Sequence, residues 1–124
     1  MQQERTAARQ RAVLAGVDTG EYDAEISMQE LCELAETAGA QVVGTVLQRR
    51  PSLDGATCLG SGRLEELKGY CQEQGVELAI FDHELTAAQI RNIERILEIP
   101  AIDRTALILD IFAQRARTSE GRLQ

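Results

Sequence analysis

Residues 76–103 read VELAIFDHELTAAQIRNIERILEIPAID, a stretch that predicts a strand, a helix and a second strand in immediate succession. The apolar run at 76–81 is typical of a buried strand. Thr86 with Gln89 three residues later forms a capping-box pattern that marks the start of the helix. The short run at 100–102 is then expected to be another strand. Strands and helices joined by such short connections are typical of a parallel sheet.

The same strand-and-helix unit is repeated toward the amino terminus. The runs at 12–17 and 41–47 predict two more strands. Between them, Ser27 with Glu30 makes a second capping-box pattern, and Gly39 supplies a left-handed stop for that helix. After the second of these strands, the segment GRLEELKGYCQEQG predicts a further helix.

These elements predict an α/β fold with a small four-stranded parallel sheet, strand order 2-1-3-4 and helices on both faces. Hydrophobic staples are expected at the two capping boxes, pairing Ile26 with Leu31 and Leu85 with Ile90. The chain is expected to divide into three parts: a flexible arm (1–10), the α/β domain (11–103), and a junction helix with the start of a helical hairpin (104–124).

The closing segment is apolar on more than one side. Asp103 or Thr105 is expected to cap its helix, and between 106 and 116 the polar positions are Asp110, Gln114 and Arg115. Leaving three large apolar side chains in water would forgo roughly 1.5 to 3 kcal/mol each, a large part of a net stability of roughly 5 to 15 kcal/mol. We interpret the helix as a junction packed on the sheet and on later sequence or a partner; the alternative is an unusually apolar core helix. Self-association through residues 104–124 is therefore expected.

The net charge of −7 is unevenly distributed along the chain. Residues 1–103 carry 9 Lys or Arg and 18 Asp or Glu, whereas residues 104–124 carry 4 Arg and 2 acidic residues. An acidic body disfavours broad nonspecific binding of nucleic acid, which requires many cations to displace counterions from phosphates. Any contact with nucleic acid is therefore expected to be local.

Three cysteines, Cys32, Cys58 and Cys71, form no CxxC motif, and the single His83 gives no pair of metal ligands at useful spacing. No metal site is expected, and a reduced cytoplasmic protein is the simplest interpretation. The first residues lack the apolar core of a signal peptide, and no apolar run approaches membrane-spanning length.

Ligands of parallel sheets bind at the carboxyl ends of the strands, and the long loop after 41–47 is the first candidate. It carries Arg49 and Arg50 and enters a helix through the turn Gly60-Ser61-Gly62-Arg63. Exposed amides at a helix start suit a phosphate of RNA or of a nucleotide, with the arginines as charge partners. Alternatively, the glycines only permit the turn, and Ser61 or Gly62 caps the helix.

Asp82 and His83 follow the strand at 76–81 and could belong to the same site. No nucleophile is tied to them by a motif, so a structural role, with Asp82 orienting loop amides, is favoured and no catalytic residue is expected. Farther along, Arg104, Arg115, Arg117 and Arg122 form the one basic cluster of the sequence. The later ones could complement the helix dipole, and the cluster could bind RNA phosphates.

Three stretches, LGSGRLEEL (59–67), FDHELTAAQIRNIE (81–94) and IDRTALILDIFAQRARTSEGRLQ (102–124), resemble the N-terminal region of the HflX-type translational GTPases. The resemblance covers the chain from about residue 11 to its end. It implies an α/β domain, then a helical hairpin, then a GTPase domain. The present residues contain neither the phosphate loop G-x-x-x-x-G-K-S/T nor the guanine-reading NKxD motif. GTP and Mg²⁺ are therefore expected for the GTPase domain and no cofactor for this chain, with ATP as a possible ligand.

The resemblance further implies a noncatalytic domain that contacts ribosomal RNA of the large subunit and positions the helical and GTPase domains. Some members of the family separate stalled ribosomes into subunits. An alternative is an independent ATP-binding domain with weak nucleotidase activity, since ATP binding is attributed to this region in some members. A receiver-like signalling domain fits the strand order but is disfavoured, because the first strand ends in a lone Asp18 and no later strand ends in lysine.

Overall fold

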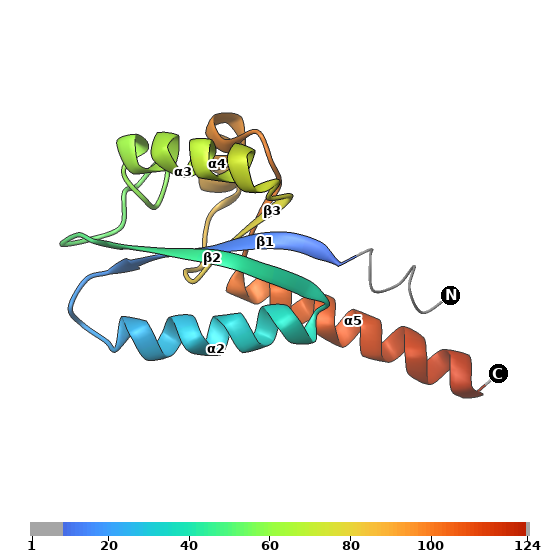
Figure 1. Cartoon of the computed structure of the whole chain (residues 1–124). Coiled ribbons are helices and arrows are strands. Elements are labelled where there is room, and N and C mark those ends of the chain that lie inside the picture. The colour runs from blue at the N-terminus through green and yellow to red at the C-terminus, as the bar shows by residue number, and fades with distance from the viewer. Residues whose placement is uncertain (1–8, 124) are drawn as a thin grey trace.

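The computed structural model describes residues 9–123, with side chains up to residue 116, and shows a sheet between two layers of helices (Figure 1). Most of the predicted arm at 1–10 therefore lies outside the described residues. The elements in chain order are β1 (Gln10–Asp18), α2 (Ala24–Thr37), β2 (Ala40–Arg49), α3 (Ser61–Gln74), β3 (Leu78–Phe81), α4 (Ala87–Leu97), β4 (Ala101–Asp103) and α5 (Arg104–Leu123).

The four strands are parallel and lie in the order β2-β1-β3-β4, which confirms the predicted sheet. Helices α2 and α5 cover one face, and α3 and α4 cover the other (Figure 1). On the α3 and α4 side the largest fully buried side chains include Val13, Val17, Leu59, Leu64, Phe81, Ile93 and Leu97. The opposite core contains Leu14, Leu31, Ile80 and Leu107. Successive strand residues point to opposite faces of the sheet, so the strands contribute side chains to both cores, as expected of a sheet buried on both faces.

The capping box of α4 is confirmed by its geometry. Gln89 N–H donates to Thr86 Oγ1 at 3.1 Å, and Thr86 N–H donates to Gln89 Oε1 at 2.9 Å. Leu85 and Ile90 both pack into the core on this side of the sheet. Local sequence thus marks this helix start. Distant residues add to it, because Leu85 N–H donates to Asp103 Oδ2 at 3.0 Å and Gln89 Nε2 donates to Asp54 O at 3.2 Å.

The capping box predicted at Ser27 and Glu30 is wrong. Helix α2 begins four residues earlier, where Asp23 is the N-cap and its Oδ1 accepts a hydrogen bond from Ile26 N–H at 3.1 Å. Ser27 consequently lies inside the helix, and the predicted staple is also absent because Ile26 is 52% exposed. Asp is as favourable an N-cap as Ser, and Asp23, in the loop before the helix, rather than Ser27 sets where α2 begins.

The other helix ends show where glycine is required. Gly39 follows the α2 cap with a φ of +99°, and Gly75 ends α3 with a φ of +65° in the left-handed region.

The predicted caps Ser61 and Gly62 are instead the first residues of α3, whose N-cap is Gly60. Of the two caps predicted for the closing helix, Asp103 is confirmed, because its Oδ1 accepts from Ala106 N–H at 2.9 Å.

Helix α5 packs on the sheet along one side only. Leu107 and Ile111 are buried, whereas Leu109 is 62% exposed and Phe112 is 60% exposed. Ala113 and Ala116 are exposed beside them. The prediction that this chain's own sheet does not cover the whole helix is therefore confirmed. The second arm of a helical hairpin stays a prediction, since the described chain ends within α5.

Candidate functional site

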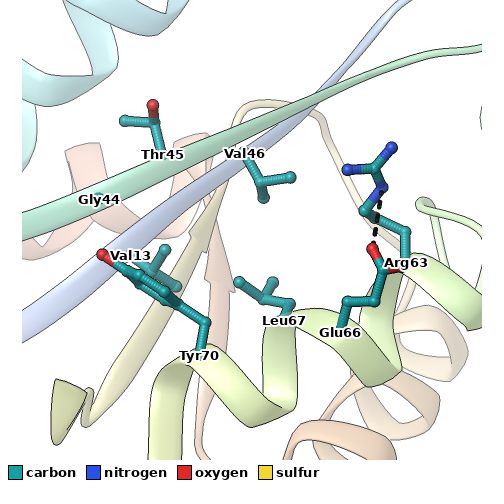
Figure 2. A pocket seen from close by; sticks show the side chains of 8 residues that line it. All are labelled: Val13, Gly44, Thr45, Val46, Arg63, Glu66, Leu67 and Tyr70. Atoms are coloured by element: carbon teal, nitrogen blue, oxygen red, sulfur yellow. Dashed lines mark ion pairs between the residues drawn. The ribbon is translucent and has the colours of Figure 1, made fainter. Parts of the chain in front are cut away.

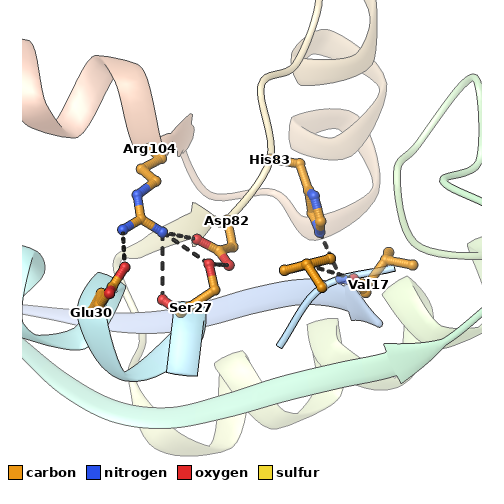
Figure 3. Close-up of polar contacts among 7 residues, drawn as sticks. Val17, Ser27, Glu30, Asp82, His83 and Arg104 are labelled. Atoms are coloured by element: carbon orange, nitrogen blue, oxygen red, sulfur yellow. Dashed lines mark hydrogen bonds and ion pairs between the residues drawn. The ribbon is translucent and has the colours of Figure 1, made fainter. Parts of the chain in front are cut away.

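At the carboxyl ends of the strands, three segments that are distant in the sequence meet around Arg104, the first residue of α5 (Figure 3). Its Nη1 donates to Asp82 Oδ1 at 2.6 Å and to Ser27 Oγ at 3.0 Å, and its Nη2 donates to Glu30 Oε1 at 3.0 Å. Ser27 Oγ in turn donates to Asp82 Oδ2 at 2.6 Å. We call these four residues the α5 latch, because they join α5, α2 and the end of β3.

The α5 latch gives Arg104 a structural role, whereas the sequence placed this residue in a basic cluster. The Asp82 side chain is 1% exposed, so its carboxylate depends on this guanidinium and on the Ser27 hydroxyl for partners. Arg104 is therefore engaged inside the fold. It also lies eleven residues before Arg115, about 16 Å along a helix at 1.5 Å per residue, so these two do not form a cluster. Arg115 is exposed, and the side chains of Arg117 and Arg122 lie outside the described ones.

His83 is also engaged by the backbone. Its Nε2 accepts a hydrogen bond from Val17 N–H at 2.8 Å, so this nitrogen carries no proton (Figure 3). The Tyr22 hydroxyl donates to Val17 O at 2.8 Å, and the two rings meet edge to face. Burial lowers the pKa of His83, although the nearby Asp82 carboxylate and the bond from Val17 oppose that shift. The imidazole is thus a neutral acceptor that completes the end of β1, and its lone pair is already used.

The loop between β2 and α3 is internally braced. Asp54 Oδ1 accepts from Ala56 N–H at 2.8 Å and from Thr57 N–H at 3.1 Å, and these two bonds lower the pKa of Asp54. Asp54 and Cys58 form a small antiparallel bridge. Burial raises the pKa of the Cys58 thiol to about 12, so it is unreactive as a nucleophile at neutral pH.

The start of α3 is formed by a glycine that lies beneath an arginine side chain. Its N-cap Gly60 offers no side chain, and no side-chain hydrogen bond caps the helix. Gly60 N–H donates to Gln48 Oε1 at 3.1 Å. A Cβ at Gly60 would lie 2.9 Å from Arg50 Nη1, so the guanidinium sits directly over this glycine. The predicted juxtaposition of an arginine with the turn of residues 60–63 is therefore present in the structure.

The remaining arginines of this corner are available to solvent. The Arg49 side chain is 90% exposed and lies 3.8 Å from Asp18 Oδ2. Arg63, in the first turn of α3, lies 3.8 Å from Glu66 Oε1 and is also exposed. Exposed pairs at this distance are weak and exchange readily. Arg50 is likewise paired, with Asp54 Oδ2 at 3.8 Å, so each of these three arginines has an acidic neighbour. We call Arg49, Arg50 and Arg63 the α3 corner.

A cavity of about 250 Å³ lies next to this corner, between β2 and α3 (Figure 2). Val13, Val46, Leu67 and Tyr70 supply apolar walls, and Arg63 with Glu66 stands at one end. Sequence reasoning missed Tyr70, whose hydroxyl donates to Val43 O at 3.0 Å. The signal was Gly44, a glycine inside a strand, where an added Cβ would lie 2.3 Å from Tyr70 Oη.

Two further observations concern other kinds of site. Among the side chains that the structure describes, which end at residue 116, no group of three or more His, Cys, Asp or Glu is arranged to hold a metal ion. Within residues 9–123, none of the helices combines the length and apolar character needed to span a bilayer.

Comparison with known proteins finds one matching family and several similar sequences. Residues 25–113 match the family described as GTP-binding GTPase N-terminal. Over 116 residues the chain is 46% identical to the GTPase HflX of Caldanaerobacter subterraneus subsp. tengcongensis, covering 94% of this chain and 27% of that protein. It is 40% identical over 122 residues to the GTPase HflX of Escherichia coli, covering 98% of this chain and 28% of the relative.

A solved structure shows the same fold. The GTP-binding protein of Sulfolobus solfataricus in complex with GDP superposes with a TM-score of 0.61 at 22% identity, covering 84% of this chain and 30% of that one. The chain thus spans less than a third of the length of these relatives.

Proposed function

This chain belongs to the GTP-binding GTPase N-terminal family found in the HflX GTPases, and we propose that it is a noncatalytic docking domain. In this proposal it contacts RNA of the large ribosomal subunit in the cytoplasm and holds the helical and GTPase domains of the whole protein in position. GTP and Mg²⁺ belong to the GTPase domain, and ribosome splitting belongs to the whole protein.

The observation that carries the proposal is the two-sided helix α5. Leu107 and Ile111 fasten one side to the sheet, while Leu109 and Phe112 stand on the side that this chain leaves exposed. The α5 latch fixes the first turn of the helix to α2 and β3 through an almost fully buried carboxylate. A helix that is rigidly held and carries an uncovered apolar face suits the transmission of orientation between domains.

The α3 corner supports the RNA contact. Arg50 stands over the uncapped amino end of α3, and the side chains of Arg49 and Arg63 are exposed. Helix amides and guanidinium groups both bind phosphate oxygens. Because the surrounding body is acidic, few phosphates would be neutralised, and the salt dependence of binding should be shallow. Arg115 and Arg117 are proposed as a second contact, on the later turns of α5.

The test is co-sedimentation of the chain with purified large ribosomal subunits. We expect Arg50→Glu with Arg63→Glu to abolish binding. The matched control is Arg91→Glu with Arg95→Glu on α4, which makes the same charge change at two exposed positions away from the corner. Equal loss in the two double variants would show that net charge alone matters and would contradict a contact at the α3 corner.

A second candidate is ATP binding at the same corner, favoured by the adjoining 250 Å³ cavity with Arg63 at its end. The phosphates would lie at the start of α3 and the base against Tyr70. Calorimetric titration of ATP and of GTP separates the two candidates. Micromolar binding that is lost in Arg63→Ala would support the nucleotide site, whereas no heat of binding from either nucleotide supports the docking domain.

A further inference from the structure

The outer edge of β2 is unusually long for an unpaired strand. Strand β2 runs from Ala40 to Arg49 and pairs with β1, and among residues 9–123 no strand pairs with its other edge. Arg50 N–H donates to Asp18 O at 3.1 Å. The backbone groups of Arg50 therefore face β1. Successive residues of a strand point their backbone groups to opposite sides, so every second residue counted back from Arg50 also faces β1. The residues between them, which include Thr45 and Leu47, present their N–H and C=O groups to the open edge.

The composition of this edge does not protect it from pairing. No charged residue and no proline occurs between Ala40 and Gln48. Solvent-exposed edges are ordinarily blunted by lysine, proline, bulges or a covering segment. One bulge is present, where the register with β1 shifts between Ala12 and Val13, but the pairing over 44–49 is regular. The regular stretch is therefore open to another strand.

Both faces of the edge are hollowed beside the strand. The 250 Å³ cavity lies on the α3 side, next to Gly44, Thr45 and Val46. A second cavity of about 430 Å³ lies on the α2 side, where Met28, Gln29 and Cys32 face Thr45 and Leu47. A strand added at this edge would place alternate side chains into space on both sides of the sheet.

We propose that β2 pairs antiparallel with β2 of a second copy of this chain, so that two four-stranded sheets join into one of eight strands. The two-fold axis passes through Val46. Thr45 of each copy then exchanges two backbone hydrogen bonds with Leu47 of the other, which satisfies the outward groups of both residues.

Charge complementarity on α3 identifies the occupant as a second copy. Arg63 and Glu66 line the same cavity beside β2, and within one chain they form only a long, exposed pair (Figure 2). A two-fold axis at Val46 reverses the direction of the facing helix, so Arg63 of each copy faces Glu66 of the other. The edge is thus complementary to itself in backbone polarity and in charge.

The test is sedimentation velocity of the 124-residue chain over a series of concentrations. We expect the wild-type chain to dimerise, and Thr45→Pro to be monomeric, since proline removes an outward N–H without disturbing the ladder to β1. Arg63→Glu should weaken the dimer about tenfold, because two symmetry-related pairs become repulsive. Adding Glu66→Arg to that variant should restore dimerisation. If Thr45→Pro does not fold, Arg63→Glu and its combination with Glu66→Arg test the proposed dimer in its place.

Phe112→Asp on the exposed side of α5 is the matched control and should leave the dimer intact. Dimerisation lost in Phe112→Asp and kept in Thr45→Pro would overturn the proposal in favour of association through α5, as predicted for residues 104–124. A wild-type chain that stays monomeric at every concentration would overturn it as well.

Discussion

Arg104 Nη1 lies 2.6 Å from Asp82 Oδ1, which joins the first residue of α5 to the residue that follows β3 (Figure 3). Arg104 also holds Ser27 and Glu30 of α2. One guanidinium therefore sets the direction in which α5 leaves the sheet. If α5 carries the orientation of further domains, this contact matters for function as well as for stability.

We expect Arg104→Ala to lower the free energy of unfolding by about 3 kcal/mol, because it leaves the buried Asp82 carboxylate with Ser27 as its main remaining partner. Urea unfolding followed by circular dichroism measures the change. Arg91→Ala, an exposed arginine on α4, should change it by less than about 0.5 kcal/mol. Adding Asp82→Ala to Arg104→Ala should recover part of the loss; a double variant that shows the full sum of both single losses would argue against direct coupling.

The stability of the fold should fall as the pH is lowered through the range in which histidine titrates. Burial lowers the pKa of His83 from 6.5, so the unfolded chain takes up this proton at a higher pH than the folded chain does. The contribution of His83 is therefore present above pH 6.5 and is lost as the pH falls through the lower folded pKa. The loss between about pH 7 and about pH 5.5 should be larger for the wild type than for His83→Gln. Identical pH profiles would show that His83 is not buried as described.

Gly44→Ala should destabilise the fold by about 1 to 3 kcal/mol, because the new methyl group would overlap Tyr70 Oη at 2.3 Å. Combining it with Tyr70→Leu should recover part of this loss by removing the hydroxyl and ring. Thermal unfolding of the two single variants and the double variant measures the coupling. The matched control is Gly55→Ala, where an added Cβ meets no atom within 4 Å.

The two leucines of α5 should respond differently to truncation. Leu107→Ala removes a buried side chain from the core shared with α2 and should cost about 2 to 5 kcal/mol, whereas the exposed Leu109→Ala should cost less than about 0.5 kcal/mol in this chain. Denaturant unfolding separates these outcomes. A large loss in Leu109→Ala would mean that a second copy or another segment already covers this face.

The three thiols should react with iodoacetamide in a defined order. Cys32 is half-buried on the surface of α2, whereas Cys58 and Cys71 are buried. Burial raises the pKa of all three, and that of Cys58 reaches about 12. Mass spectrometry of the folded protein at mildly alkaline pH should therefore show alkylation of Cys32 first. Early modification of Cys58 would show that the braced loop opens.

The fold was predictable because its signals are local and periodic. Apolar runs at four places, separated by amphipathic segments and glycine stops, determined a parallel sheet, and the rules for short crossovers left the order 2-1-3-4. The uncovered side of α5 followed from the same kind of argument, since more apolar residues occur there than one sheet contact can bury. The open turn at Gly60 was also visible in the sequence.

The hydrogen-bond partners of the polar side chains were not predictable, and two similar capping-box patterns show why. Thr86 with Gln89 forms a capping box, whereas Ser27 and Glu30 lie inside a helix that Asp23 caps. Their side chains instead bind Arg104 and Asp82 from distant segments. The sequence by itself determined which residues form helices and strands and which faces are apolar, because burial follows local periodicity. Only the tertiary structure decided the partners of Arg104, His83 and Tyr70, because a polar side chain satisfies whichever group folding brings within about 3 Å.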